Sequence, residues 1–223
     1  MTCYFAFPAS DALRDGSNTL QENFNRGVKE SQSVLFVKVA QLFSDEIVDA
    51  LLLNIVRASD QQKASTRILE SFAGLIKSTV HALIRNVLSK MNNDELRPLA
   101  DVIRSRRLTL TRDGVTTDYV CFEMPAGFHA DLRKVMIAGT SGEKDTHRMT
   151  ELMLRFSDMS HQAFYEDSVA PLKLGFIGRN MVSMGGTAIK KGSHSSTKSL
   201  IPTLEGQELK DFATYFLNFL IEA

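Results

Sequence analysis

Residues 34–57 read VLFVKVAQLFSDEIVDALLLNIVR and form the most apolar segment of the chain. Four polar residues recur along it at spacings of three and four, namely Lys38, Gln41, Asp45 and Asp49. On an α-helix this spacing places them on one narrow stripe, and nearly every other position is apolar. Such a helix must bury most of its circumference, so we expect either the central helix of the fold or a subunit interface. Ser44-Asp45-Glu46 also has the pattern of a helix start, which leaves a break there as an alternative.

Residues 61–91 carry the clearest helical periodicity in the sequence. Apolar side chains recur along this segment at spacings of three and four: Ile68, Phe72, Ile76, Val80, Leu83, Val87 and Met91. Basic residues occupy the opposite face. Because only the short polar link 58–60 separates this segment from residues 34–57, we expect the two helices to form an antiparallel hairpin.

The pattern then changes from helical to alternating. Residues 108–123 contain the turn dipeptide Asp113-Gly114 between two alternating arms, which predicts a β-hairpin. Pro98 is expected to be the first residue of a short helix over 98–105, the helical position that tolerates proline best. Near the N-terminus, Thr2–Phe7 is strand-like.

Further elements are expected on both sides of these segments. Asp15-Gly16 indicates a turn, with a helix possible over 20–29. In the second half, helices are expected over 128–138, ended by Gly139, over 145–170, and over 204–221. Short strands with a Gly185-Gly186 turn are expected within 172–189. Residues 190–199, KKGSHSSTKS, lack apolar side chains and are expected to be a flexible loop.

Together these segments predict a mainly α fold with a minor β part. Its core is a helical hairpin of two long helices, accompanied by further helices and a small β-hairpin around 108–123. We expect a single domain over 1–223, with a division into a helical part, 1–105, and a mixed α/β part, 106–223, as an alternative.

Composition narrows the class of protein. The 223 residues include 26 Lys+Arg and 26 Asp+Glu, so whole-protein basicity is excluded as a nucleic-acid signal. No basic start precedes an apolar leader, and charges within 34–56 argue against a membrane span. Cys3 and Cys121 lack metal-ligand spacing, which favours a cytoplasmic protein with two incidental thiols, a disulfide being the alternative.

Four potential metal ligands or acid–base groups share one face of the helix expected over 145–170: His147, Glu151, Asp158 and His161. Glu151 and Asp158 are about 10 Å apart along a helix axis, so one ion cannot take all four. We therefore prefer a solvated face with two helix-stabilising pairs, His147/Glu151 and Asp158/His161, and predict no metal and no cofactor.

Basic residues gather in two segments with few acids. Candidate contacts for phosphate or nucleic acid are Arg104, Arg106, Arg107, Arg112, Arg179, Lys190, Lys191 and Lys198. The alternative is pairing with acids elsewhere in a neutral protein, and we prefer it.

No nucleophile elbow, phosphate loop or other catalytic motif is present in the sequence, so no catalytic residue is predicted. We expect a non-enzymatic interaction or regulatory protein that self-associates through its apolar helices, as a homo-oligomer or with a protein partner. The alternative is an oligomeric protein that binds the nucleic-acid backbone through the arginines in 97–112 and the basic segment 190–198.

Overall fold

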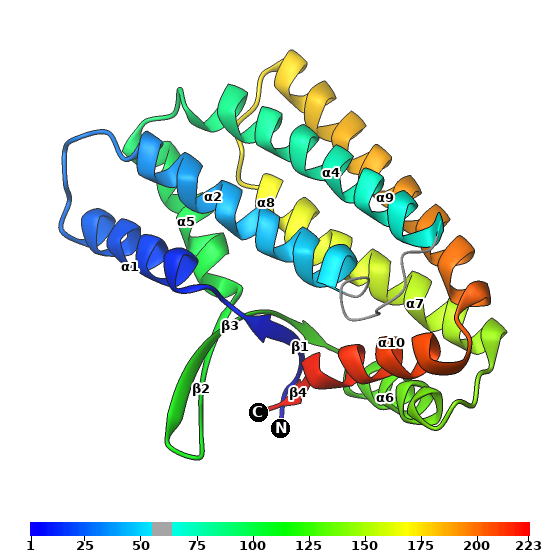
Figure 1. Cartoon of the computed structure of the whole chain (residues 1–223). Helices are drawn as coiled ribbons and strands as arrows, with labels where there is room; N and C mark the ends of the chain where they lie inside the picture. Colours follow the sequence, from blue (N-terminus) through cyan, green and yellow to red (C-terminus); the bar gives the residue numbers. More distant parts are fainter. Residues whose placement is uncertain (55–63) are drawn as a thin grey trace.

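A computed structural model describes residues 1–54 and 64–223 (Figure 1). The chain is mainly α-helical with a small four-stranded antiparallel sheet, which confirms the predicted fold class. The main hydrophobic cluster draws on residues from both halves of the sequence, from Phe5 to Leu220.

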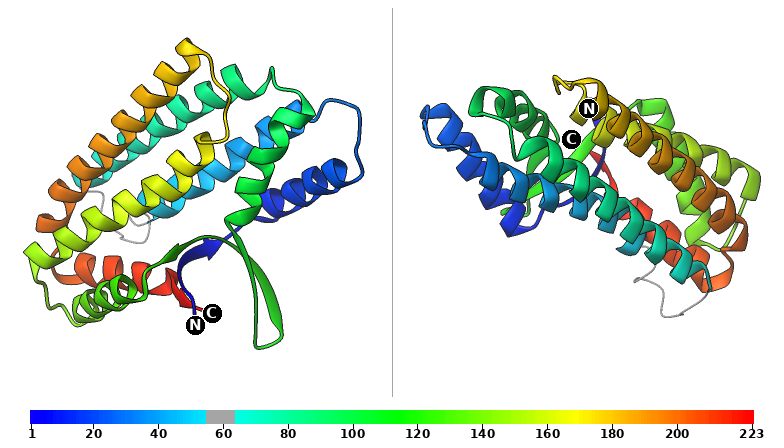
Figure 2. Two further views of the ribbon diagram at one scale, coloured as in Figure 1. Left: turned by 180° about the vertical axis from the view of Figure 1, so that it is seen from behind. Right: turned by 90° about the horizontal axis from the view of Figure 1, so that it is seen from above.

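Four long helical rods form a bundle. The first rod is α2 (Ser33–Val48) with the π-helical turn η1 (Asp49–Leu53), and the second is α4 (Ala64–Leu88). The third is α7 (Thr146–His161), continued by the π-helical turn η2 (Gln162–Glu166) and by α8 (Asp167–Val169); the fourth is α9 (Phe176–Thr203). Figures 1 and 2 show these rods lying side by side as two antiparallel hairpins.

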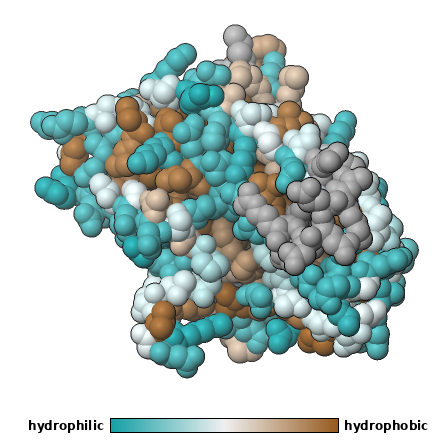
Figure 3. Space-filling model, in the orientation of Figure 1, coloured by the Kyte–Doolittle hydropathy of each residue, from teal (hydrophilic) through white to brown (hydrophobic). Residues whose placement is uncertain are grey.

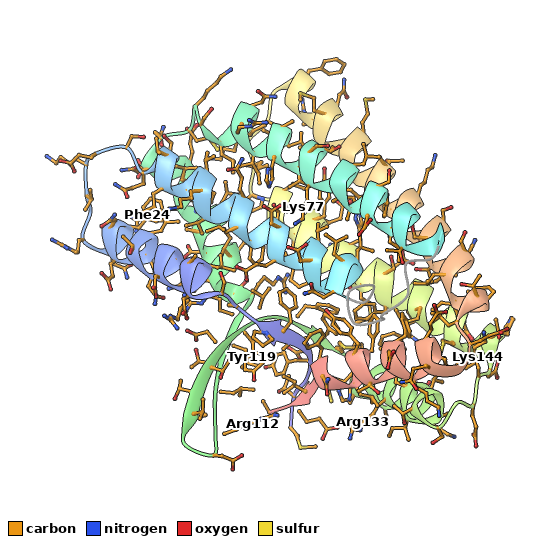
Figure 4. The ribbon with its side chains drawn as sticks, in the orientation of Figure 1. Phe24, Lys77, Arg112, Tyr119, Arg133 and Lys144 are labelled. Atoms are coloured by element: carbon orange, nitrogen blue, oxygen red, sulfur yellow. The ribbon has the colours of Figure 1, made fainter. Side chains whose placement is uncertain are left out.

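The hairpin of α2 and α4 confirms the first sequence prediction, although its link, residues 58–60, lies outside the described residues. No break occurs at Ser44, because α2 continues to Val48. Six apolar residues of α2 are buried: Phe36, Val39, Ala40, Phe43, Ile47 and Val48. Two residues of the predicted polar stripe, Asp45 and Asp49, face α4. Lys77 Nζ (labelled in Figure 4) donates to Asp49 Oδ1 at 2.9 Å, and His81 lies 2.9 Å from Asp45.

Strands from the two ends of the chain meet in one sheet. Its strands are β1 (Cys3–Pro8), β2 (Arg107–Arg112), β3 (Val115–Met124) and β4 (Leu220–Glu222), in the order β2-β3-β1-β4. The predicted hairpin is confirmed, with slightly wider bounds. Asp113 and Gly114 both have positive φ, 51° and 78°, as a two-residue type I′ turn requires.

The helices α6 (Ala126–Thr140) and α10 (Gly206–Phe219) lie beside the sheet (Figure 1). Phe5 of β1 is 0% exposed and is the centre of the aromatic core. Its ring contacts those of Phe7, Phe122, Phe156, Phe216 and Phe219, at centroid distances of 4.8–6.3 Å. The first strand therefore joins the sheet to α7 and α10.

The two cysteines lie on opposite faces of the sheet. Side chains alternate along β1, so Cys3 shares the face of Phe5, whereas Cys121 is opposite Ala6 and packs in a separate small cluster. Both thiols are free and buried, so the disulfide alternative is wrong. Burial raises the pKa of the Cys121 thiol to about 11.

Two sequence predictions fail in the first half of the chain because helix caps lie earlier than expected. Asn92 and Glu95 form a capping box that starts α5 (Asn93–Ser105), so Pro98 lies inside the helix. Likewise, Ser10 caps α1 (Asp11–Asn25), and Asp15-Gly16 is helical and not a turn. The predicted helical segment 20–29 is helical only to Asn25.

The largest correction concerns α9. This single helix replaces both the strands expected in 172–189 and the loop expected in 190–199. Aromatic rings of neighbouring helices approach the backbone of α9 at two of its glycines. A Cβ atom on Gly186 would lie 2.7 Å from the Tyr165 ring, and a Cβ atom on Gly192 would lie 2.0 Å from the Phe72 ring. Tertiary packing thus outweighs the low helix propensity of glycine and serine.

The other helices of the second half agree more closely with expectation. The predicted helix 145–170 corresponds to α7, η2 and α8, and Asp145 is its N-cap. Helix α6 passes through Gly139, whose missing side chain admits Ala213 of α10, so that glycine does not end the helix. Helix α10 ends at Phe219, and the last predicted helical residues form β4.

Lys144 lies in the loop between α6 and α7 (Figure 4). Its ammonium donates to the carbonyl oxygens of Ile201, Pro202 and Leu204, which satisfies the end of α9. Within the described residues, no helix combines the length and the hydropathy needed to cross a bilayer.

Candidate functional site

The eight basic candidates lie in two separate places. Arg104, Arg106, Arg107 and Arg112 lie at the end of α5 and along β2, whereas Arg179, Lys190, Lys191 and Lys198 all lie on α9. Figures 1 and 2 show α9 and β2 at opposite ends of the molecule, and Figure 4 labels Arg112 on the hairpin. These residues do not line one common groove.

Several of these cations also have acidic partners. Arg104 lies 3.1 Å from Asp101, and Arg106 is ion-paired with Asp167. Arg107 lies 3.3 Å from Asp118 and donates to Asn18 Oδ1 at 2.7 Å. Such contacts fit pairing with acids, the interpretation preferred from the sequence.

The four residues predicted on one face of α7 are separated by their partners. His147 is exposed, and Glu151 pairs with Arg148 at 2.9 Å. Asp158 accepts from Lys190 and lies 2.9 Å from His194 Nε2, both on α9. The pairs proposed from spacing, His147/Glu151 and Asp158/His161, are therefore replaced by other contacts.

The contacts of Asp158 tie α7 to α9. Burial acts to raise the pKa of this carboxyl, but hydrogen bonds from Lys190 and His194 outweigh it, and the pKa lies below its ordinary value. The carboxylate is therefore charged at neutral pH, and its contacts with Lys190 and His194 hold α7 and α9 together.

A cavity of about 170 Å³ lies inside the bundle, and we call it the main cavity. Residues from α2, η1, α4, α7, η2, α9 and α10 line it, including Leu52, Val80, Met153, Phe164, Ile189 and Phe216. A second cavity of about 130 Å³ adjoins it, and Ile47, Val80 and Tyr165 line both. Protein interiors hold few voids larger than a water molecule, and an apolar cavity of ~150 Å³ is enough to take up benzene.

Both π-helical turns of the described chain are at this cavity. Leu51 and Leu52 belong to η1, and Phe164 and Tyr165 belong to η2. A π-helical turn adds a residue to a helix and shifts the side chains that follow, and such turns often occur at functional sites. Both turns therefore contribute apolar or aromatic side chains to the cavity wall.

Three serine hydroxyls in the cavity wall donate to carbonyl groups of their own helices. Ser160 donates to the carbonyl of Phe156, and Ser193 donates to that of Ile189, both at 2.9 Å. Ser44 donates to Gln41 at 2.9 Å. These side chains therefore add little polarity, and the cavity has an apolar interior.

His161 differs from these serines, because one of its ring nitrogens has no hydrogen-bond partner among the described residues. Its side chain is 8% exposed, and it lies in the cavity wall. Nε2 lies 3.0 Å from Glu166 Oε1, while Nδ1 is buried with no hydrogen-bond partner among the described residues. Because a carboxylate only accepts hydrogen bonds, Nε2 carries a proton, and an imidazole with only that proton has a free lone pair on Nδ1.

Tyr165 fixes the orientation of that imidazole. Its ring stacks on His161 at a centroid distance of 5.2 Å, and its hydroxyl donates to the Val182 carbonyl at 2.7 Å. Burial raises the pKa of Tyr165 to about 12, so the phenol stays protonated. Close contact with Gly185 and Gly186 of α9 leaves the ring little room to move.

Sequence reasoning selected His161 but assigned it to a solvated face. No local pattern marks the cavity, because its wall comes from five helical segments far apart in the sequence. The nearest signal is the nearly all-round apolar character of residues 34–57, since a helix buried on all sides has a wide apolar interface with its neighbours.

Comparisons with protein-family models, with curated proteins and with solved structures found no significant match to this chain. Its fold and its cavity define it as a helical-bundle protein with an apolar cavity among its helices.

Proposed function

We propose that this chain is a non-enzymatic binding protein that holds a small apolar molecule carrying a hydroxyl group inside its helical bundle. The observation that carries the proposal is an otherwise apolar cavity whose wall includes His161, a side chain with a buried Nδ1 that has no hydrogen-bond partner among the described residues. Ligand sites are typically apolar cavities with a few placed polar groups, and they often lie between the helices of bundles.

The hydroxyl group is inferred from the proton on Nε2. Since Nδ1 accepts, its partner must donate, as an alcohol or phenol does. A buried polar atom without a partner costs about 1–3 kcal/mol, and a ligand hydroxyl would remove that cost. The remainder of the ligand would displace the void along Leu52, Val80 and Phe164.

Titration with 2-naphthol, followed by its fluorescence, tests the proposal. We expect saturable 1:1 binding. The variant His161→Phe should bind 2-naphthol about three- to tenfold more weakly, the worth of one hydrogen bond. Naphthalene, which lacks the hydroxyl, should bind both proteins equally. Absence of saturable binding to the wild type, or equal losses for both compounds in the variant, would reject the proposal.

Self-association is a second proposal, and the outer face of α2 supports it. Val34 is 82% exposed, and Leu35 and Val37 are partly exposed beside it. Figure 3 shows apolar residues gathered over α2 on a mostly hydrophilic face. The other large apolar side chains of α2 are buried or partly buried within the same chain, so this patch is the apolar area of α2 that a second copy could cover.

Light scattering after size exclusion measures this association. We expect a dimer whose dissociation is promoted by Val34→Glu and not by Val115→Glu, since Val115 is 65% exposed on the distant hairpin. A monomer at tens of micromolar would remove the proposal. The separation and pairing of the basic residues give a nucleic-acid groove less support than either proposal.

A further inference from the structure

Three side chains with metal-binding groups meet where the sheet contacts α6. Cys3 and Glu222 are directly opposite each other on β1 and β4, and His129 lies in the first turn of α6, soon after β3 ends opposite Cys3. One sulfur, one imidazole nitrogen and one carboxylate oxygen from these residues all lie within 4.8 Å of one another. Figure 1 shows the ends of β1 and β4 side by side at this point.

The imidazole of His129 lacks hydrogen bonds there. Its side chain is 1% exposed. Nε2 is buried with no partner among the described residues, and Nδ1 lies 3.7 Å from Glu222 Oε1, too far for a hydrogen bond. A buried histidine with neither nitrogen hydrogen-bonded is uncommon in native proteins and calls for an explanation, such as a bound water or ion.

The donor set fits a particular class of ion. Thiolate, imidazole and carboxylate are the three ligand types of protein zinc sites, with bond lengths of about 2.0–2.3 Å. Tetrahedral coordination at those lengths requires ligand atoms about 3.5 Å apart, so the cluster must contract by roughly 1 Å. Glu222 is 42% exposed, so its carboxylate can move toward the buried Cys3 and His129.

We propose that Cys3, His129 and Glu222 bind a zinc ion, with water in the fourth position. On binding, the Cys3 thiol releases its proton to solvent, and its sulfur donates an electron pair to the metal. The ion would tie the three-residue strand β4 to β1 and to α6. This site lies outside the main cavity, so a negative zinc-binding result would not affect the proposed ligand-binding function.

Cobalt titration of the full chain, prepared without an added histidine tag, tests this site. We expect 1:1 binding with visible bands of tetrahedral cobalt and an ultraviolet thiolate-to-cobalt band, both removed by added zinc. Cys3→Ser should lose the thiolate band and weaken binding at least tenfold. The Cys121 thiol lies on the other face of the sheet, so Cys121→Ser should keep the thiolate band and the wild-type affinity. A wild-type spectrum without the thiolate band overturns the proposal.

A measurement on the wild type covers the case in which Cys3→Ser fails to fold. Zinc should slow alkylation of Cys3 at least tenfold, as mapped by peptide mass spectrometry, because coordination removes the free thiolate. Cys121 is the internal reference, and its rate should not change. Equal alkylation of Cys3 with and without zinc also overturns the proposal.

Discussion

Phe5→Ala is expected to lower the free energy of unfolding by about 3–5 kcal/mol, the usual cost of removing a fully buried phenylalanine. Phe5 is 0% exposed and its ring contacts five other phenylalanines. These neighbours come from β1, β3, α7 and α10, so they cannot all collapse into the space that the ring leaves. Urea denaturation monitored by circular dichroism measures the change.

The matched control is Phe176→Ala, the same substitution at a ring that is 74% exposed. It should change stability by less than about 0.5 kcal/mol. A loss below about 1 kcal/mol for Phe5→Ala would show that β1 does not join the sheet to the helices as described.

Filling the main cavity is expected to weaken binding of 2-naphthol at least tenfold. Ser196 of α9 lines that cavity, and Ser196→Leu would place a branched apolar side chain inside it. The same change should raise the unfolding temperature, because filling a void adds packing contacts and buried apolar area. Fluorescence titration and thermal unfolding give the two readouts.

Ser195→Leu provides the control, since Ser195 is the adjacent residue on the same helix but is exposed. It adds the same side chain outside the cavity and should leave the affinity unchanged. Equal weakening by both variants would place the probe on the outer surface of α9.

Strong periodicity made part of this fold predictable. The apolar pattern of residues 61–91 and the Asp113-Gly114 turn both specify local structure that packing then preserves. Where packing overrides local preference, prediction failed. Gly185, Gly186 and Gly192 read as turn or loop residues, yet they lie inside α9, where Tyr165 and Phe72 occupy the space that larger side chains would need.

The sites were harder to predict than the fold. His161 was visible as a candidate, but its burial depends on neighbours in α9 and η2 that spacing along α7 does not reveal. Cys3, His129 and Glu222 are too far apart in sequence to form a motif, and they meet only through strand pairing and the position of α6. Both sites depend on tertiary contacts.

Uptake of a hydroxylated apolar molecule into the bundle can be observed directly. The most direct measurement is a crystal structure of the protein soaked with 4-iodophenol, with iodine located by its anomalous scattering. We expect an iodine peak inside the main cavity, among Leu52, Val80 and Phe164, and a phenol oxygen within about 3 Å of His161 Nδ1. Iodine found only at the molecular surface, with the cavity holding no probe, would contradict it.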